Sequence, residues 1–290
     1  MGKILITDVR AHPGDSAFLI DDETTAILYD SGFAFTGFKV AEKIKNILRE
    51  RNLDYIFLTH SHYDHALGAA YALKFWPDAK VVAGEYASKI FAKPTAKEVM
   101  RDLDKKIAKQ CNMQNYEDLT DDLRVDIAVK DGDKVVAGDL EFIAIDLPGH
   151  TKCSVGYYCP KEKLLLSCET IGVYNGEDDV VPSYLVGYDM SLKSIEKVQS
   201  LDIENILIPH YGILDGEKTK LYLKKAEESA VSVKEEIIVS MLKDNKTKEE
   251  IVGRFKERFY YGYIKEIYPI DAMELNTGIM IDLLKREFPD

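Results

Sequence analysis

The sequence predicts an α/β fold followed by a C-terminal helical segment, and three features of the chain support this prediction. Up to residue 214, short apolar runs rich in β-forming residues alternate with stretches whose apolar residues recur at helical spacing. A dense polar motif directly follows one of these runs, where open α/β sheets usually place their sites. After residue 214 only helical patterns remain. We therefore expect an α/β domain over residues 1–214, with a helical extension over residues 215–290 packed on it.

The spacing of apolar residues predicts the individual helices and strands of the first domain. Val40, Ile44, Ile47 and Leu48 form one apolar stripe, which predicts a helix. Residues 97–118 are charged and amphipathic, and we interpret them as an insert. The expected strands are 16–21 and 25–30 (a hairpin), 54–59, 80–83, 125–129, 134–136, 140–147, 155–159, 163–167 and 205–210, and the other expected helices begin near 66, 85 and 190.

The C-terminal segment has the signature of three helices. Apolar residues recur along one face of a helix over 217–242. Thr247-x-x-Glu250 and Asp271-x-x-Glu274 each match a capping box, in which the first side chain and the fourth satisfy each other's backbone N–H groups. Each pair therefore predicts the start of a further helix.

Composition limits the partners of the chain. It has 290 residues, 46% of them hydrophobic, with 38 basic and 50 acidic residues and a net charge of −12. This balance disfavours nucleic acid and anionic membranes, which require basic surfaces. The first residues lack a basic and then apolar leader, and the four cysteines lack zinc-ribbon or disulfide-framework spacing. We expect a cytoplasmic protein that acts on a small molecule and could form a homodimer.

The polar motif is a cluster of histidines. His60, His62 and His65 fall within six residues, beside Asp64. Imidazole is the commonest metal ligand near neutral pH, and a carboxylate adds a hard oxygen donor. His60 and His62 are two apart, so in an extended loop they point to one side, which leaves Asp64 and His65 for a second ion. The cluster therefore predicts a metal site.

The motif His-x-His-x-Asp-His after an apolar strand resembles the signature of the metallo-β-lactamase superfamily. The other motifs of that family match Asp30 after an early strand, His150 in Pro-Gly-His-Thr, and His210 at the end of a late strand. The family's bridging Asp is matched by Glu169. The resemblance implies an αββα sandwich that binds two metal ions. It implies His60, His62 and His150 around one ion, Asp64, His65 and His210 around the other, and Glu169 between them.

Several assignments within this site stay open. Cys168 precedes Glu169, and neighbouring side chains on a strand face opposite ways, so only one of the two can enter the site; we favour Glu169. Asp30 and Asp54 are interpreted either as groups that orient imidazoles or as strand-end caps. Tyr63 is a candidate donor to a developing oxyanion. Zinc is the expected metal, with iron or manganese as alternatives.

The function expected from the resemblance is metal-dependent hydrolysis. Two divalent cations lower the pKa of a shared water and supply hydroxide at neutral pH, with Asp64 among the catalytic ligands. The expected substrate is a small-molecule ester, thioester or lactone. The alternatives are a phosphodiesterase of the same superfamily, a metal-binding or ligand-binding protein without turnover, and an iron oxidoreductase.

Overall fold

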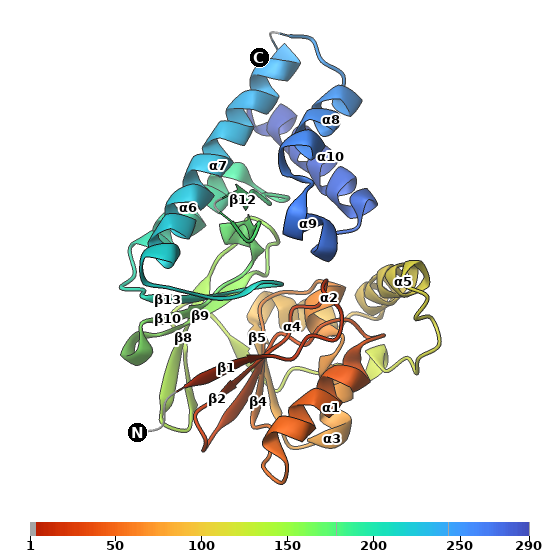
Figure 1. The fold of residues 1–290 in the computed structure, drawn as a ribbon, viewed down its shortest axis with the longest axis vertical. Helices are drawn as coiled ribbons and strands as arrows, with labels where there is room; N and C mark the ends of the chain where they lie inside the picture. Colours follow the sequence, from red (N-terminus) through yellow and green to blue (C-terminus); the bar gives the residue numbers. More distant parts are fainter. Residues whose placement is uncertain (1–3, 178, 243, 290) are drawn as a thin grey trace. The chain divides into compact units, whose positions relative to one another are not determined.

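The computed structural model describes residues 4–177, 179–242 and 244–289. The chain divides into two compact units, each described by itself below (Figure 1). Unit 1 comprises Met1–Asp146 and Cys153–Leu166, and unit 2 comprises Leu147–Lys152 and Ser167–Asp290. None of the helices in the described ranges is both long and apolar enough to cross a membrane.

Unit 1 contains a six-stranded mixed sheet in which the strands follow chain order. β1, β2 and β3 pair antiparallel, and β3 to β6 pair parallel. The expected hairpin is confirmed, because Phe18 pairs with Tyr29 and Asp21 with Ala26. The strands are β1 Leu5–Asp8, β2 Phe18–Asp21, β3 Ala26–Tyr29, β4 Tyr55–Leu58, β5 Lys80–Gly84 and β6 Ile127–Val129.

A second set of strands in unit 1 packs on one face of this sheet. β7 Lys134–Ala137, β8 Leu140–Asp146, β9 Val155–Cys159 and β10 Leu164–Leu166 pair antiparallel in the order β10-β9-β8-β7. The Phe57 ring on β4 lies 5.2 Å from that of Phe142 on β8 and 4.7 Å from that of Tyr157 on β9, measured between centroids. The Tyr157 hydroxyl donates to the Leu58 carbonyl over 2.8 Å. These buried contacts hold the two layers face to face.

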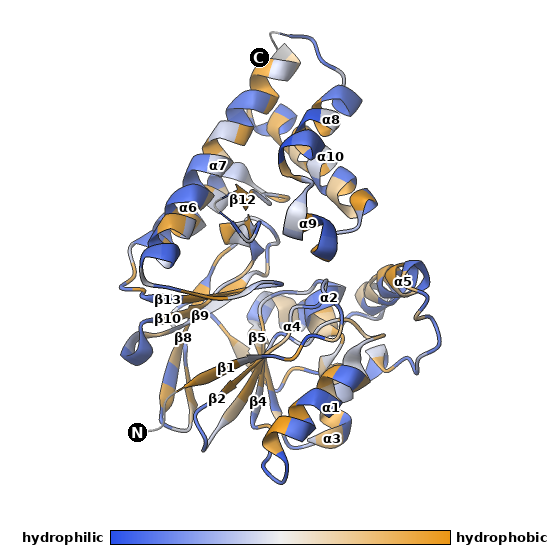
Figure 2. Cartoon of the chain, viewed as in Figure 1, coloured by the Kyte–Doolittle hydropathy of each residue, from blue (hydrophilic) through white to orange (hydrophobic). Residues whose placement is uncertain are grey.

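Helices join the first sheet in a second buried core of unit 1. Three residues of the expected stripe of α1 (Gly37–Leu48), namely Val40, Ile44 and Leu48, are buried in the same cluster as strand residues such as Leu28 and Ile56. Ile47, the fourth, is exposed. The expected insert forms a helix, α5 (Pro94–Gln110), which carries both polar and apolar residues along its length (Figure 2). The other helices are α2 Tyr63–Ala66, α3 Ala69–Phe75 and α4 Glu85–Phe91, with 3₁₀ turns at Thr120–Asp122 and Pro160–Glu162.

Unit 2 is mainly helical. Figure 1 shows α8, α9 and α10 gathered along one side of the long helix α7, and α7 also contacts α6. Two short antiparallel pairs, β11 with β12 and β13 with β14, complete the unit. Its elements are η3 Glu169–Ile171, β11 Val173–Tyr174, β12 Val180–Val181, α6 Tyr188–Gln199, β13 Asn205–Ile208, β14 Gly212–Asp215, α7 Gly216–Leu242, α8 Lys248–Phe259, α9 Gly262–Ile267 and α10 Ile270–Glu287.

One of the two expected capping boxes is confirmed and the other is wrong. The Thr247 hydroxyl accepts from the Glu250 N–H over 3.2 Å, and the Glu250 carboxylate accepts from the Thr247 N–H over 2.8 Å. Asp271 is not an N-cap: α10 already begins at Ile270, with Pro269 as the N-cap residue. The short helix α9 was not expected. A domain boundary at residue 214 stays a prediction.

Candidate metal centre

Unit 1 holds four of the seven expected ligands in one strand–loop–helix segment. β4 ends at Leu58, and the chain passes through His60 and His62 before α2 begins at Tyr63. The His60 ring lies 4.5 Å from that of His62 and 4.1 Å from that of His65, between centroids. His60 and His65 are buried, whereas His62 and Asp64 are partly exposed. The structure thus brings the three imidazoles together, and His65 lies as close to His60 as His62 does. Which of them share an ion stays a prediction.

Asp30 is the centre of the hydrogen bonds behind these imidazoles. Its Oδ2 atom lies 2.7 Å from Nδ1 of His65, so the buried carboxylate accepts the Nδ1–H. The hydroxyl groups of Ser16 and Thr59 also donate to this carboxylate, as does the Thr59 N–H. Asp30 adopts a φ of 49°, a left-handed conformation that is uncommon for a residue other than glycine. Such conformations cluster at functional sites, where the surroundings compensate for the strain.

His60 is oriented in the same way through a hydroxyl group. Its Nδ1 lies 3.0 Å from Oγ1 of Thr59. Because the Thr59 hydroxyl donates to Asp30, its oxygen accepts from Nδ1–H of His60. The Nδ1 atoms of both His60 and His65 therefore carry the proton, which leaves the Nε2 lone pair of each ring as the metal-binding atom.

Unit 2 holds the other three expected ligands. His150 follows Gly149, whose φ of 146° favours glycine and where a Cβ would lie 2.1 Å from Oγ of Ser191. The Nδ1 of His150 donates to Ser183, 2.8 Å from its Oγ and 3.1 Å from its carbonyl oxygen. The Nε2 lone pair of His150 is then the one that can bind a metal. Ser183 has no neighbour in sequence that marks this role, and sequence analysis did not find it.

Glu169 and His210 face each other in unit 2. Oε1 of Glu169 lies 2.9 Å from Nε2 of His210, and both side chains are buried. His210 has a φ of 62°, and the Tyr263 hydroxyl of α9 donates to its carbonyl oxygen. A residue of the C-terminal helices therefore supports the backbone of an expected ligand, and sequence analysis did not identify it.

The structure changes the reasoning about Cys168. β10 ends at Leu166, so Cys168 and Glu169 do not lie on a strand and strand alternation does not apply to them. Instead, extended Cys168 precedes the 3₁₀ turn that begins at Glu169. The Tyr222 hydroxyl of α7 donates to the Gly172 carbonyl at the end of this turn. Burial raises the pKa of Tyr222 well above its ordinary value, so the phenol remains a neutral donor.

Two expected site residues have contacts of other kinds. The Asp54 carboxylate accepts from the Ala26 N–H over 2.9 Å, a contact that joins β4 to the start of β3 and matches the strand-end alternative for this residue. Tyr63 is the first residue of α2, and its ring lies 5.7 Å from that of Phe33. Its role as a donor to substrate stays a prediction.

The residues within each unit fit a divalent metal ion. Three imidazoles have an Nδ1–H held by a carboxylate, hydroxyl or carbonyl oxygen, the arrangement common to metal-binding histidines. Carboxylates also lie beside expected ligands: Asp64 beside His65 in unit 1, and Glu169 beside His210 in unit 2. Imidazole nitrogens with carboxylate oxygens suit zinc, and also iron or manganese.

This α/β fold, with histidine and carboxylate side chains that could hold a metal in the loops after its strands, is typical of a class of metal-binding proteins. Within that class, the family model described as the metallo-beta-lactamase superfamily matches residues 14–210. The chain belongs to this superfamily and has its fold, followed by the C-terminal helices.

Solved structures of the same fold cover nearly all of the chain. A metallo-beta-lactamase family protein from Thermus thermophilus has a TM-score of 0.63 at 15% identity, with 98% of this chain and 93% of that chain covered. An archaeal metallo-beta-lactamase superfamily protein from Sulfolobus tokodaii has a TM-score of 0.61 at 17% identity, with 99% of both chains covered. At these identities the likeness concerns the fold alone.

Curated relatives match part of the chain. A protein named glyoxylase B2 from Dictyostelium discoideum is 28% identical over 157 residues, which cover 51% of this chain and 49% of the relative. A protein named hydroxyacylglutathione hydrolase from Bartonella henselae is 27% identical over 171 residues, which cover 58% of this chain and 53% of the relative. The chain thus spans about half the length of the curated relatives that it matches.

Proposed function

We propose that this chain is a metal-dependent hydrolase that cleaves a thioester or a related acyl bond in a small-molecule substrate. The observation that carries the proposal is the set of hydrogen bonds at Nδ1 of His60, His65 and His150, which directs the opposite nitrogen of each ring to a metal. Relatives named hydroxyacylglutathione hydrolase favour a thioester among the acyl substrates.

The proposed ligand set follows the motifs of the superfamily. We propose that His60, His62 and His150 hold one ion, that Asp64, His65 and His210 hold a second, and that Glu169 contributes a carboxylate to both. When bound, two divalent ions would lower the pKa of a water molecule and polarise the acyl oxygen under attack. Zinc is the metal that we propose, with iron and manganese as alternatives that the same donors accept.

The residues around the ligands have separate roles in this proposal. Asp30 fixes the ring of His65, and Ser183 fixes that of His150, so that neither imidazole must reorganise when a metal or substrate binds. Tyr63 shares the short helix α2 with Asp64 and His65. We propose that its phenol donates a hydrogen bond to the oxygen that gains negative charge during attack.

The proposal is tested by metal content and substrate preference. Elemental analysis of the purified protein should find about two divalent ions per chain, the number that a paired site holds. A panel of a hydroxyacylglutathione, a lactone and a phosphodiester should show turnover of the thioester, which a chelator abolishes and the metal restores. Turnover that survives full removal of metal, or turnover of the phosphodiester alone, would contradict the proposal.

A further inference from the structure

Two loops of unit 1 contact the residues around the short helix α2. The first loop (residues 9–17) joins β1 to β2, and the second loop (residues 30–36) joins β3 to α1. From the first loop, the Ser16 N–H donates to the Asp64 carbonyl over 3.2 Å, and the Ser16 hydroxyl donates to the Asp30 carboxylate over 2.9 Å. The first loop thus contacts one expected ligand and the carboxylate that orients another.

The second loop contacts the next residue of α2. The N–H and the hydroxyl of Ser31 both donate to the His65 carbonyl, over 2.7 and 2.8 Å. The Gly32 carbonyl accepts from the Gly68 N–H over 3.0 Å, just after α2 ends. The position of α2, and of the two expected ligands on it, therefore depends on both loops.

Asp15 joins the two loops through its carboxylate. In the first loop, Oδ2 accepts from the N–H groups of Ala11 and His12, over 2.9 and 2.8 Å. In the second loop, Oδ1 accepts from the Phe33 N–H over 3.1 Å and from the Thr36 hydroxyl over 2.7 Å. The Asp15 side chain is fully buried. Burial raises the pKa of this carboxyl, and the four hydrogen bonds act in the opposite direction.

The second loop fits closely around this carboxylate. Gly32 has a φ of 75°, which favours glycine, and a Cβ at this position would lie 2.6 Å from Oδ1 of Asp15. A buried carboxylate is costly unless hydrogen bonds replace its lost hydration. Because hydrogen bonds are directional and apolar contacts are not, this junction fixes the relative orientation of the two loops more narrowly than apolar side chains would.

We propose that Asp15 is a positioning residue of the metal centre, which joins the two loops so that Asp64 and His65 are held in the orientation required for metal binding. The inference rests on the part of the proposed function that assigns these two residues to a metal. Asp15 acts through the loops and not as a ligand, because each of its oxygens already accepts two hydrogen bonds.

The first test compares the metal affinity of Asp15→Asn with that of the wild type. An amide has one acceptor oxygen and one NH₂ group, so one of the two loops loses its acceptor. We expect the affinity for zinc to fall by about tenfold or more, the usual scale for groups that orient ligands, measured by competition with a chromophoric chelator. The visible absorption of bound Co²⁺ should also weaken, because water that replaces a protein ligand raises the coordination number. Unchanged zinc affinity with an unchanged Co²⁺ spectrum would overturn the proposal.

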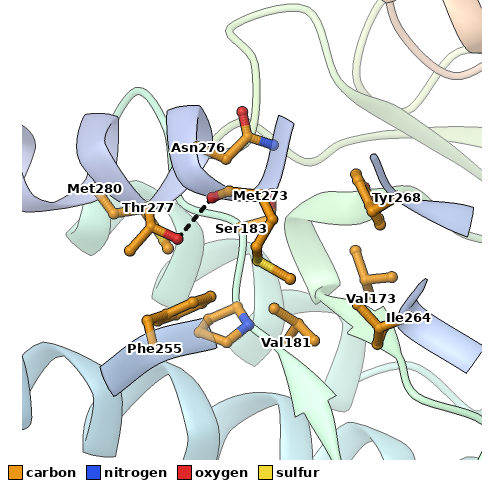
Figure 3. Close-up of a pocket in the computed structure, with 11 residues that line it drawn as sticks. Val173, Val181, Ser183, Phe255, Ile264, Tyr268, Met273, Asn276, Thr277 and Met280 are labelled. Atoms are coloured by element: carbon orange, nitrogen blue, oxygen red, sulfur yellow. Dashed lines mark hydrogen bonds between the residues drawn. The ribbon is translucent and has the colours of Figure 1, made fainter. Parts of the chain in front are cut away.

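Two control variants separate positioning from a loss of stability. Asp22→Asn alters a buried carboxylate that accepts from backbone N–H groups of its own hairpin turn. Phe255→Leu removes buried apolar surface in unit 2, at an apolar cavity that Val181 and Met280 also line (Figure 3). Phe255→Leu should lower the free energy of unfolding, and both variants should keep the zinc affinity and the Co²⁺ spectrum of the wild type. If either control lost metal as Asp15→Asn does, destabilisation would explain the effect and the proposal would be overturned.

Thr36→Val tests the same junction if Asp15→Asn does not fold. Oδ1 of Asp15 then loses one donor, and α1 loses no cap, because the Thr36 side chain makes no capping hydrogen bond to that helix. Zinc affinity should fall by a smaller factor, and an unchanged affinity would overturn the proposal. Tight zinc binding without any thioester turnover would overturn the proposed function but leave the role of Asp15 standing. Turnover by the wild type, with unchanged zinc affinity in the Asp15 and Thr36 variants, would overturn the role of Asp15 alone.

Discussion

Oδ2 of Asp30 lies 2.7 Å from Nδ1 of His65, and both side chains are fully buried in unit 1. A buried carboxylate is costly unless hydrogen bonds replace its lost hydration. Here the hydroxyls of Ser16 and Thr59 and the N–H of Thr59 supply the other donors. The four donors keep Asp30 in one orientation, and Asp30 in turn keeps His65 in one tautomer.

Asp30→Asn should therefore weaken metal binding. The amide NH₂ group cannot accept the Nδ1–H, so the imidazole loses its fixed tautomer and orientation. We expect a loss of about 10- to 100-fold in metal affinity, the usual scale for this type of partner, measured by competition with a chromophoric chelator. Asp54→Asn is the matched control, because the Asp54 carboxylate accepts from a backbone N–H of β3. Equal metal affinities in the two variants would contradict the role of Asp30.

Asp64→Asn should remove most hydrolytic activity and leave the fold intact. Asp64 is partly exposed on α2, so an isosteric amide does not disturb the core. An amide oxygen is a weaker ligand than a carboxylate and brings no negative charge to the metal. We expect a fall in kcat of at least about tenfold, the scale on which ligand partners act, with an unchanged circular dichroism spectrum. Wild-type turnover in this variant would exclude Asp64 from the metal site.

Glu169→Ala and Cys168→Ser test which of two neighbouring residues binds the metal. Removing the Glu169 carboxylate takes away the group that faces Nε2 of His210. We expect metal content to fall toward one ion per chain and turnover to fall by at least about tenfold. Cys168→Ser should change neither quantity. If only the cysteine variant loses metal, the thiolate is the ligand and the alignment of this motif is off by one residue.

Asp104 should make the stability of the protein depend on pH. Burial raises the pKa of this carboxyl from 3.8 to about 7, although it accepts from the Ala34 N–H and the Tyr116 hydroxyl. The folded state then holds a proton that the unfolded chain releases, so the free energy of unfolding falls as the pH rises from about 4 to about 7.

Asp104→Asn should remove this pH dependence. An amide cannot ionise, and its oxygen can still accept from the Ala34 N–H. Urea unfolding should show that the free energy of unfolding falls between pH 5 and pH 8 by roughly 2 kcal/mol more in the wild type than in the variant. Asp102 is exposed on α5, the helix that also carries Asp104, and Asp102→Asn should behave as the wild type does. If the free energy of unfolding changed equally with pH in the wild type and in Asp104→Asn, Asp104 would already be ionised at pH 5.

The sequence by itself determined the features that depend on neighbouring residues. The histidine cluster, the buried face of α1 formed by Val40, Ile44 and Leu48, and the capping box at Thr247 all arise from spacings within a few residues. The pattern Asp271-x-x-Glu274 shows that local spacing alone can give a wrong prediction. It has the same spacing as the Thr247 box, but Pro269 and Ile270 start α10 before Asp271 can cap it.

Tertiary structure alone decided the contacts between distant segments. The bonds of Ser183 to His150 and of Tyr263 to His210 join residues 33 and 53 positions apart, and no local spacing rule predicts such pairs. The placement of Glu169 after the end of β10 likewise depends on where strand pairing stops, at Leu166, which is set by the partner strand and not by the residue types alone. The dense histidine cluster and the resemblance to the superfamily motifs thus predicted which residues could bind a metal, whereas long-range packing decided which groups orient them.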